Sequence, residues 1–444
     1  VDAATGEGVL GTIVYVYDKA VCEGEACRGT KPVVLVDAGA DGSFEVSGMP
    51  ANPQLMLKAP GYGLLFPADL QAGDCGAPYC LDAQMQPFEA RGTYMKFDDL
   101  GSRELVIQRL DQVAESPFIN AIVVDLKDER GLTTWEPENS IARELGIRAP
   151  NRMSAQEFVA LAKERGIYVI ARFLTFQDNA LAEGRPEWSI RAKSNPDQPW
   201  YESPNTAIPK AYVSAFRPEV REYEISLAQE LATLGVDEIQ FDYFRFPGRS
   251  KPEDYIYGAE STAQTRREAI SSFSHELMAA LKPYGVFTAI DVFGSIIVNG
   301  NEPLIGQNLE DLMIGVDYLS PMIYPQVWEP RDFPECGDPV LCPYTVIYES
   351  VAKAIELTPL PTKVRPWIQG YDNNYRQEGP ARGYFFAVPE MLIQRQAAED
   401  AGAAGWLFWS GGANMPDEIF GPMPSLPELE AQIRARQGGR SGPY

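Results

Sequence analysis

The stretch LATLGVDEIQFDYFRFPG, residues 231 to 248, decides the fold of this chain. A helical segment ends at a glycine, and a short strand that alternates apolar and polar residues follows at once. A glycine that closes a helix just before a buried strand is typical of repeated βα units. Strand alternation turns Ile239 and Phe241 toward the helices. The polar residues, Gln240 and Asp242, then face the other side, which in a closed barrel is the interior.

The same order of strand, loop, helix and glycine recurs from about residue 88. Helices that end in glycine precede IYVIARF, VFTAIDVFG, VDYLSPMIY and WLFWS, and with VDEIQFD the segments RGTYMKF, NAIVVDLKD and KVRPWIQGYD give eight strands. Eight βα units predict an α/β protein with a (β/α)8 TIM barrel. We expect the barrel to span residues 87–422, and a C-terminal helix and tail to occupy residues 423–444.

Residues 1–86 follow a different pattern, with short alternating segments between Gly, Pro, Asp and Asn turns. GTIVYVYD, KPVVLVDA, GSFEVSGM and QLMLKAPG predict the strands of a small all-β sandwich. The stretch from TGEGVLGTIVYV to GSFEVSGMPANPQLMLKAPGY resembles the carboxypeptidase regulatory-like or transthyretin-like sandwich. That resemblance implies an accessory module, and the segment has no catalytic constellation of its own.

The charge balance restricts the expected partners. Lys and Arg number 38 against 62 Asp and Glu, a net charge of −24, and no basic cluster is present. Nucleic acids and anionic membrane surfaces bind basic patches, so neither is an expected partner. The sequence contains no run of 18 apolar residues, so we do not expect a membrane-spanning helix. The first residues contain neither Met nor an apolar signal core, so we expect a mature or trimmed product.

The cysteine pattern favours disulfides over a metal site. No two cysteines have the C-x-x-C spacing, and the single histidine, His275, lies in a helical run, so a zinc site is disfavoured and no metal or cofactor is expected. Local disulfides predict an exported protein, which is periplasmic, cell-surface or extracellular. The three expected pairs are Cys22/Cys27, Cys75/Cys80 and Cys336/Cys342.

In a TIM barrel the active site lies at the carboxyl ends of the strands. The polar and aromatic residues predicted at those ends, in strand order, are Asp125, Lys127 and Asp128; Arg172; Gln240, Asp242 and Arg245; Asp291; Tyr324; Gln369 and Asp372; and Trp409.

Asp242 and Asp291 come from adjacent strands, an arrangement that suits glycoside hydrolysis. One carboxylate must stay ionised to stabilise an oxocarbenium-like centre, and the other must hold a proton for the leaving oxygen. Arg172 or Arg245 would keep one of them charged, and an apolar setting would raise the pKa of the other. The structural alternative is that Asp242 and Arg245 form a buried salt bridge that supports the loop. Asp125 and Asp128 could hold a hard cation, but a structural or substrate-orienting role through Lys127 fits better.

Tryptophans are a second signal of carbohydrate binding, because sugar rings stack their C–H faces on such side chains. Packing of long loops is the alternative for any one of them, and Trp409 is the residue we expect to contact a glycan. The others near predicted strand ends are Trp135, Trp188, Trp200, Trp328 and Trp406. The chain has no G-x-S-x-G elbow, no Walker loop and no triad histidine, so esterase, NTPase and protease functions lack support.

The barrel segments also resemble a known family. AIVVDLKDERG, IARFLTFQDNALAEGRPEW, VDEIQFDYFRFP, TAIDVFG, IGQNLEDL, VDYLSPMIYP, DPVLCPY and AGWLFWS follow in order like the motifs of a bacterial glycosyl hydrolase family, formerly a domain of unknown function. The resemblance covers nearly the whole barrel and implies a TIM-barrel glycosidase. The positions it marks are Asp125, Lys127, Asp128, Arg172, Asp242, Arg245, Asp291 and Tyr324.

The strand around Asp242 also looks like the chitinase signature D-x-x-D-x-D-x-E. Gln240 and Phe244 stand where that signature has an aspartate and its catalytic glutamate. Substrate-assisted chitin cleavage is therefore not implied, and the proton donor must come from another strand.

The sequence predicts an exported glycoside hydrolase that cleaves a poly- or oligosaccharide, with Asp242 as nucleophile or principal carboxylate and Asp291 as general acid/base. Residues expected to bind or orient substrate are Asp125, Lys127, Asp128, Arg172, Gln240, Arg245, Tyr324, Gln369 and Trp409. The alternatives are a non-catalytic glycan-binding barrel and a polysaccharide lyase. The oligomeric state is left open.

Overall fold

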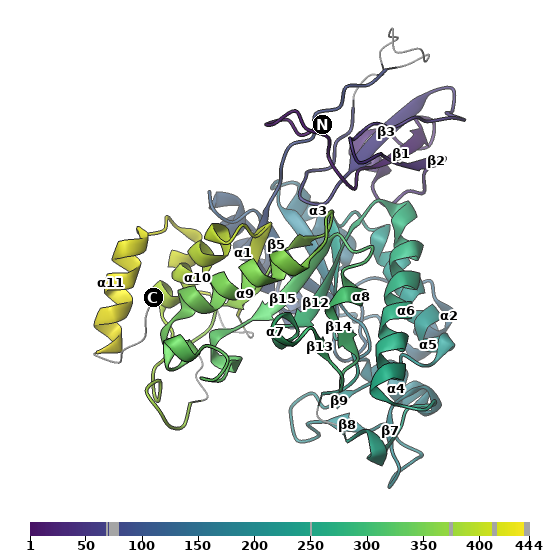
Figure 1. The fold of residues 1–444 in the computed structure, drawn as a ribbon. Helices are drawn as coiled ribbons and strands as arrows, with labels where there is room; N and C mark the ends of the chain where they lie inside the picture. The colour runs from purple at the N-terminus through teal and green to yellow at the C-terminus, as the bar shows by residue number, and fades with distance from the viewer. Residues whose placement is uncertain (68–69, 71–79, 249–250, 373–375, 411–414, 439–444) are drawn as a thin grey trace.

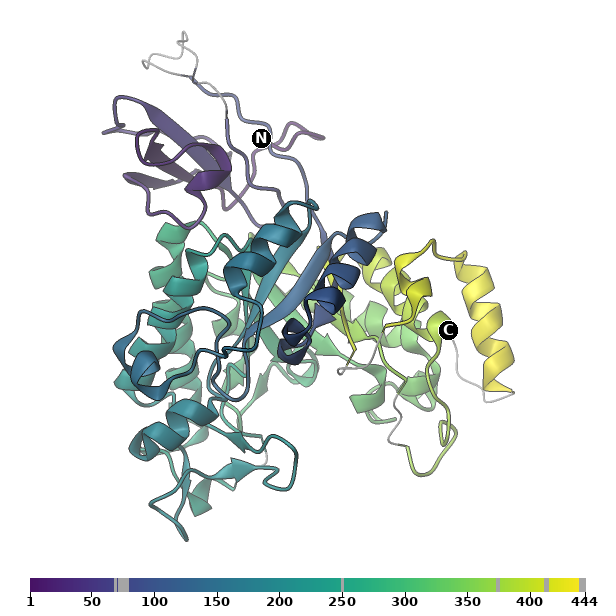
Figure 2. The ribbon, with the colours of Figure 1, turned by 180° about the vertical axis from the view of Figure 1, so that it is seen from behind.

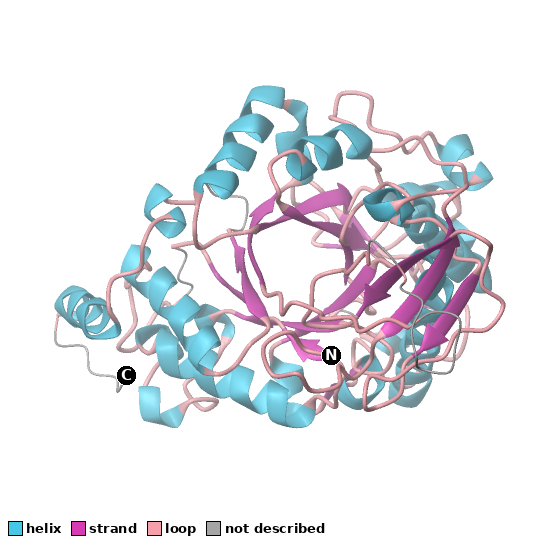
Figure 3. Ribbon diagram, turned by 90° about the horizontal axis from the view of Figure 1, so that it is seen from above, coloured by secondary structure: helices cyan, strands magenta, loops and turns pink. Residues whose placement is uncertain are grey.

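The computed structural model describes residues 1–444 except 68–69, 71–79, 249–250, 373–375, 411–414 and 439–444. Its main body is a closed eight-stranded parallel barrel, which confirms the predicted fold (Figures 1 and 3). Neighbouring strands pair in chain order, and β18 pairs with β4 to close the barrel. The barrel strands are β4 (Ala90–Met95), β5 (Ala121–Lys127), β6 (Tyr168–Leu174), β10 (Glu238–Asp242), β12 (Phe287–Phe293), β15 (Tyr318–Ile323), β16 (Lys363–Val364) with β17 (Trp367–Gln369), and β18 (Gly405–Trp409).

The seventh strand position is divided in two. The predicted segment KVRPWIQGYD forms β16 and β17, which both pair with β15 on either side of Pro366. Proline has no N–H to donate to the sheet, so the ladder is interrupted there.

Helices surround the barrel and bury the outward faces of its strands (Figure 3). Ile239 and Phe241 belong to this outer core, as the alternation predicted. The helices are α1 (Arg103–Glu115), α2 (Ser140–Leu145), α3 (Ala155–Lys163), α4 (Asn179–Gly184), α5 (Pro218–Ala232), α6 (Ala263–Leu281), α7 (Ser295–Asn299), α8 (Leu309–Leu312), α9 (Pro343–Leu357), α10 (Val388–Asp400) and α11 (Leu426–Gln437). Short strands in the loops are β7 (Arg191–Ala192), β8 (Tyr201–Glu202), β9 (Lys210–Ala211), β11 (Tyr255–Ile256), β13 (Asn301–Glu302) and β14 (Gln307–Asn308).

The N-terminal unit is all-β, as predicted. Its strands β1 (Ile13–Asp18), β2 (Val34–Asp37) and β3 (Pro53–Lys58) form an antiparallel sheet in the order β2-β1-β3. The predicted strand at residues 42–49 does not form. Its apolar residues still pack on the core of this unit. The alternating pattern therefore indicated correctly which side chains are buried, but the segment does not pair with a neighbouring strand.

The N-terminal unit is attached to the base of the barrel, where the strands begin (Figures 1 and 2). Lys58 forms a buried ion pair of 2.7 Å with Asp317, which directly precedes β15. The Tyr318 hydroxyl accepts a hydrogen bond of 3.0 Å from Gly61 N, and Arg28 pairs with Asp237 at 2.7 Å just before β10. This unit therefore lies at the end of the barrel opposite to the carboxyl ends of the strands.

Two of the three predicted disulfides are formed. They are Cys22–Cys27 and Cys336–Cys342, with Cα atoms 5.1 Å and 5.8 Å apart. The third predicted pair, Cys75/Cys80, does not have both members in the described part of the chain. Cys80 is described and half-buried, but Cys75 lies outside the described residues, so the bond between them stays a prediction.

The C-terminal helix α11 forms a small apolar contact of its own with the barrel. Leu429 and Ile433 of this helix pack on Leu392 and Ile393 of α10. Within the described part of the chain, no helix has the length and apolar character needed to cross a membrane.

Candidate active site

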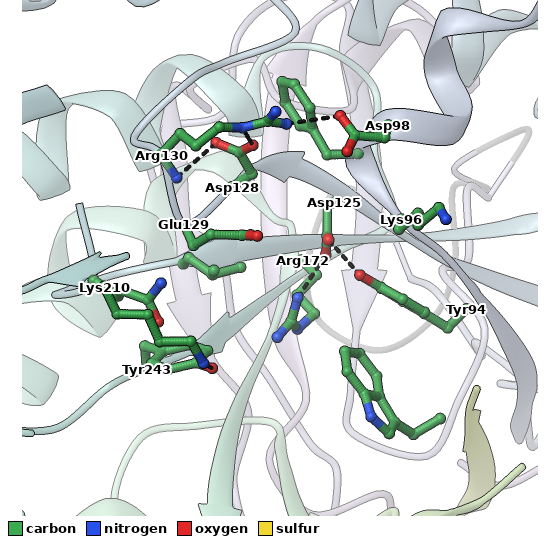
Figure 4. A pocket seen from close by; sticks show the side chains of 14 residues that line it. Tyr94, Lys96, Asp98, Asp125, Asp128, Glu129, Arg130, Arg172, Lys210 and Tyr243 are labelled. Carbon is green, nitrogen blue, oxygen red and sulfur yellow. Dashed lines mark hydrogen bonds and ion pairs between the residues drawn. The ribbon is translucent and has the colours of Figure 1, made fainter. Parts of the chain in front are cut away.

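A pocket of about 250 Å³ opens at the carboxyl ends of β4, β5, β6, β10 and β18 (Figure 4). Its walls carry charged side chains of both signs together with aromatic rings. The lining residues are Tyr94, Lys96, Phe97, Asp98, Asp125, Asp128, Glu129, Arg130, Arg172, Leu174, Gln177, Lys210, Tyr243 and Trp409.

Arg172 joins two of the predicted acids. Its Nη1 donates to Asp125 Oδ1 at 2.7 Å, and its Nη2 and Nε donate to Asp242 Oδ2 at 2.5 Å and 3.2 Å. All three side chains are buried, so each charge needs a partner close by. The guanidinium thus binds both carboxylates at once.

Aromatic rings hold the other side of Arg172. The Tyr94 hydroxyl donates to Asp125 Oδ2 at 2.5 Å, and the Tyr94 and Trp409 ring centres lie 4.3 Å apart. The Arg172 guanidinium carbon lies 5.0 Å from the Trp409 ring centre, a cation–π contact. Trp409 is half-buried and lines the pocket, and its contact with a glycan stays a prediction.

The backbone after Asp242 is in a conformation that few residues adopt. Tyr243 has a φ of 49°, in the left-handed region that disfavours side chains, and its N–H donates to Asp242 Oδ1 at 2.5 Å. Lys210 Nζ donates to the Tyr243 hydroxyl at 2.9 Å. Asp242 is therefore fixed on one oxygen by its own strand end and on the other by Arg172.

Asp291 has the opposite environment. Its side chain is almost fully buried, Trp367 Nε1 donates to its Oδ1 at 2.9 Å, and its Oδ2 has no hydrogen-bond partner among the described residues. Burial raises the pKa of this carboxyl well above its ordinary value, and the negative charge of Asp242 raises it further, while Arg172 opposes the shift. Burial and the charge of Asp242 therefore both favour the protonated form of the Asp291 carboxyl. Neither Asp291 nor Asp242 is among the residues that line the described pocket; Arg172 and Tyr243, which contact Asp242, are.

A second ionic group stands on the pocket wall. Asp128 accepts hydrogen bonds from Arg130 Nε at 2.5 Å and from Arg130 N at 3.0 Å, and Arg130 Nη2 donates to Asp98 at 2.9 Å. Burial raises the pKa of Asp128 to about 7. Asp125 and Asp128 thus have Arg partners, and in the described parts of the chain no three His, Cys, Asp or Glu side chains form a metal-binding group.

Lys127 lies outside the pocket. Its fully buried ammonium contacts Leu174 O at 2.8 Å, Asp178 at 2.9 Å and Glu224 at 3.2 Å, on the side of β5 that faces α5. Burial raises the pKa of Glu224 to about 8, and the charge of Asp178 contributes to the shift. The predicted contact of Lys127 with substrate does not fit this placement.

The remaining predicted residues surround the acids at greater depth. Gln240 Nε2 donates to Ser320 Oγ at 3.1 Å inside the barrel. Arg245 donates to Phe246 O at 3.1 Å and lies 4.9 Å from the ring centre of Tyr243, so Arg172 and not Arg245 forms the ion pair with Asp242.

The residues predicted after the sixth and seventh strands lie beside one another. The rings of Tyr324 and Tyr371 are 6.1 Å apart, and Gln369 Nε2 donates to Tyr371 O at 3.1 Å. Burial raises the pKa of the half-buried Tyr324. Asp372 is exposed.

Of the tryptophans near strand ends, only Trp409 is among the residues that line the described pocket. Trp135 and Trp406 are buried and donate to Glu230 and Glu399, each at 3.0 Å. Trp328 packs on Phe333. Trp188 and Trp200 are partly buried and pack against the outer core.

The sequence analysis missed several residues of the site. Tyr94 and Trp367 lie on strands that were predicted, and their period-2 positions could have marked them as inward-facing. Gln177 and Lys210 come from the long connection between β6 and α5, where no periodic pattern marks them. Tyr243 follows Asp242 directly, and only its backbone angle sets it apart.

The closed parallel barrel presents buried acids and an arginine at the carboxyl ends of its strands, which is where TIM-barrel enzymes have their active sites. The family model described as "Putative glycosyl hydrolase domain" matches residues 92–415, and the chain belongs to this family. No curated protein matches the chain.

Several solved structures are similar to this chain. The PgaB (BpsB) glycoside hydrolase domain from Bordetella bronchiseptica matches with a TM-score of 0.51 and 14% identity, over 78% of this chain and 98% of that domain. A chitobiase from Flavobacterium johnsoniae matches with a TM-score of 0.49 and 14% identity, over 81% of this chain and 52% of the chitobiase. A hypothetical protein from Ruminiclostridium thermocellum is 27% identical, with a TM-score of 0.38, over 45% of this chain and 97% of that one. At these identities the first match supports the fold alone.

Proposed function

We propose that this protein is a glycoside hydrolase that cleaves glycosidic bonds in a poly- or oligosaccharide. Asp242 is the nucleophile or principal carboxylate, and Asp291 is the general acid/base. The observation that carries the proposal is the unequal environment of two acids: Arg172 forms an ion pair with Asp242, while Asp291 is buried without a cationic partner in contact among the described residues, and burial and the charge of Asp242 raise its pKa.

This inequality matches what glycosidic cleavage needs. The ionised Asp242 stabilises or attacks the positive charge that develops at the anomeric carbon, while the proton of Asp291 goes to the departing oxygen. Water then completes the hydrolysis after the acid has given up its proton. The free Oδ2 of Asp291 leaves one carboxyl oxygen available for this proton.

The remaining site residues support these two. Asp125 and Tyr94 orient Arg172, and Trp409 offers a ring on which a sugar can stack. Export of the protein is part of the proposal, because the two disulfides require an oxidising compartment to persist.

The test is product release from a panel of bacterial and algal polysaccharides, measured by new reducing ends. We expect Asp242→Asn to lower the rate about 10²-fold or more on any substrate that the natural chain cleaves. Asp41→Asn, in an exposed turn of the N-terminal unit, is the control and should keep full activity. Equal activity of Asp242→Asn and the control would remove Asp242 from the mechanism.

The alternative is a glycan-binding barrel without a working acid, and it is favoured by the absence of both Asp242 and Asp291 from the residues that line the described pocket. Retention of a glycan on affinity electrophoresis, without any product over the whole panel, would favour binding over hydrolysis.

A further inference from the structure

Gln177 is the unusual residue of the pocket wall. It lines the pocket, its side chain is fully buried, and neither Nε2 nor Oε1 has a hydrogen-bond partner among the described residues. A buried amide without partners is destabilising, so native structures rarely leave one without a reason. No other described lining residue has buried side-chain polar atoms in this state.

The backbone on both sides holds Gln177 in place. Val213 N donates to Phe176 O at 2.9 Å, and Asp178 N donates to Ala211 O at 3.2 Å, so the segment runs antiparallel to residues 211–213. In extended backbone, side chains alternate between faces. Phe176 and Asp178 share one face, and Gln177 presents its amide on the other, toward the pocket.

Its two neighbours are anchored in the core. The ring of Phe176 packs 4.9 Å from that of Phe273, and Asp178 pairs with Lys127 at 2.9 Å while it caps α4 through Leu181 N at 2.8 Å. Lys127 therefore acts on the pocket from behind, by fixing the segment that carries Gln177. The backbone of Gln177 is thus fixed through both neighbours, and its buried amide has no partner among the described residues, an arrangement preorganised for a ligand.

We propose that Gln177 is a substrate-recognition residue that binds two adjacent free hydroxyls of a sugar ring. One hydroxyl donates to Oε1 and the other accepts from Nε2. This inference rests on the proposed function and specifies which sugar substituents the same pocket recognises.

The donor and acceptor count favours a vicinal diol over other sugar substituents. A carboxylate only accepts, so it would leave Oε1 unpaired. An N-acetyl group is a trans amide whose N–H and C=O point apart, so it cannot pair with both atoms of one glutamine amide. Adjacent hydroxyls supply a donor and an acceptor on the same side.

The test compares Gln177→Met with natural Gln177, both in the Asp242→Asn background, which slows turnover enough for binding to be measured. Binding is screened on an array of bacterial, plant and algal oligosaccharides, and affinity for the best-bound glycan is measured by calorimetry. We expect Gln177→Met to weaken that binding by about tenfold or more, and a deoxy form of the glycan to lose the same factor with natural Gln177.

Thermal unfolding gives the second readout. Because methionine removes a buried amide that has no partner, Gln177→Met should leave the melting temperature unchanged or raise it. The matched control is Gln229→Met, where Nε2 donates to Ala280 O at 3.2 Å: it should lower the melting temperature and leave binding unchanged.

Unchanged affinity, a lower melting temperature for Gln177→Met, or no bound glycan on the array would each overturn the role of Gln177. A chain that binds glycan through Gln177 but cleaves none would overturn the proposed hydrolase alone. Full hydrolysis by Gln177→Met would overturn the recognition role and leave the hydrolase standing.

Discussion

Replacing Lys127 by methionine tests the buried ionic group behind the pocket. The ammonium pairs with Asp178 at 2.9 Å and Glu224 at 3.2 Å, and all three side chains are buried. Because the pKa of Glu224 is raised to about 8, its carboxyl is mostly protonated at pH 7, and Asp178 is the principal ionic partner of Lys127.

Lys127→Met removes the cation that pairs with the buried Asp178. Because removal of one partner of a buried ion pair is strongly destabilising, we expect the free energy of unfolding to fall by about 3–5 kcal/mol. Glu224→Gln keeps the neutral shape and should cost about 1 kcal/mol or less. Guanidinium unfolding at pH 7, followed by tryptophan fluorescence and circular dichroism, measures both.

The pH dependence of the free energy of unfolding provides an independent test. Because the pKa of Glu224 is higher in the folded chain than in the unfolded one, the folded chain binds the extra proton. Its stabilising effect is complete below pH about 4.5 and is lost as pH rises through about 8, and Glu224→Gln should remove this decline. A Lys127→Met cost below 1 kcal/mol, or a Glu224→Gln cost equal to it, would refute the reasoning.

Three further outcomes are expected. Arg172→Lys should lower kcat on a confirmed substrate by about 10²-fold with a small change in KM, because a lysine cannot bind Asp125 and Asp242 together through a planar fork; full activity would contradict this. Trp409→Ala should raise KM by about tenfold more than it lowers kcat in steady-state assays, since it removes a stacking ring; an effect on kcat alone would place the ring elsewhere. Lys58→Met should lower the unfolding free energy by about 3 kcal/mol in denaturant titrations and leave kcat/KM unchanged, because the Lys58–Asp317 pair joins the N-terminal unit to the base of the barrel; a change in kcat/KM would place that unit in catalysis.

The barrel was predictable because its signals are local. A glycine before a strand and an apolar period of two are properties of neighbouring residues, and both appear at VDEIQFD. The inward direction of Gln240 and Asp242 followed from the same period.

The direction of the Lys127 side chain could not be predicted from the period of two. Counting by two from Asp125 turns Lys127 into the barrel, but the register of β5 against β6 shifts between these two residues. A bulge of this kind reverses the direction of the side chains that follow it. Lys127 consequently faces α5 and the buried acids, and no sequence signal marks the bulge.

The sequence left the partner of Asp242 open between Arg172 and Arg245. Arg245 is three residues away in the chain, but Arg172 comes from the adjacent strand β6 and forms the ion pair. Pairing across strands depends on how the barrel closes. The same is true of the pocket wall, where Gln177 and Lys210 come from a long connection without periodicity.

The role of Asp291 as proton donor is tested by the pH profile of kcat/KM for Asp291→Asn. We predict that the natural chain loses activity at high pH as Asp291 releases its proton, and that Asp291→Asn is about 10²-fold to 10⁴-fold slower without that basic limb. Asp128→Asn, whose carboxyl also has a raised pKa on the pocket wall, should keep the limb. A basic limb that persists in Asp291→Asn and disappears in Asp128→Asn would contradict the account and make Asp128 the acid.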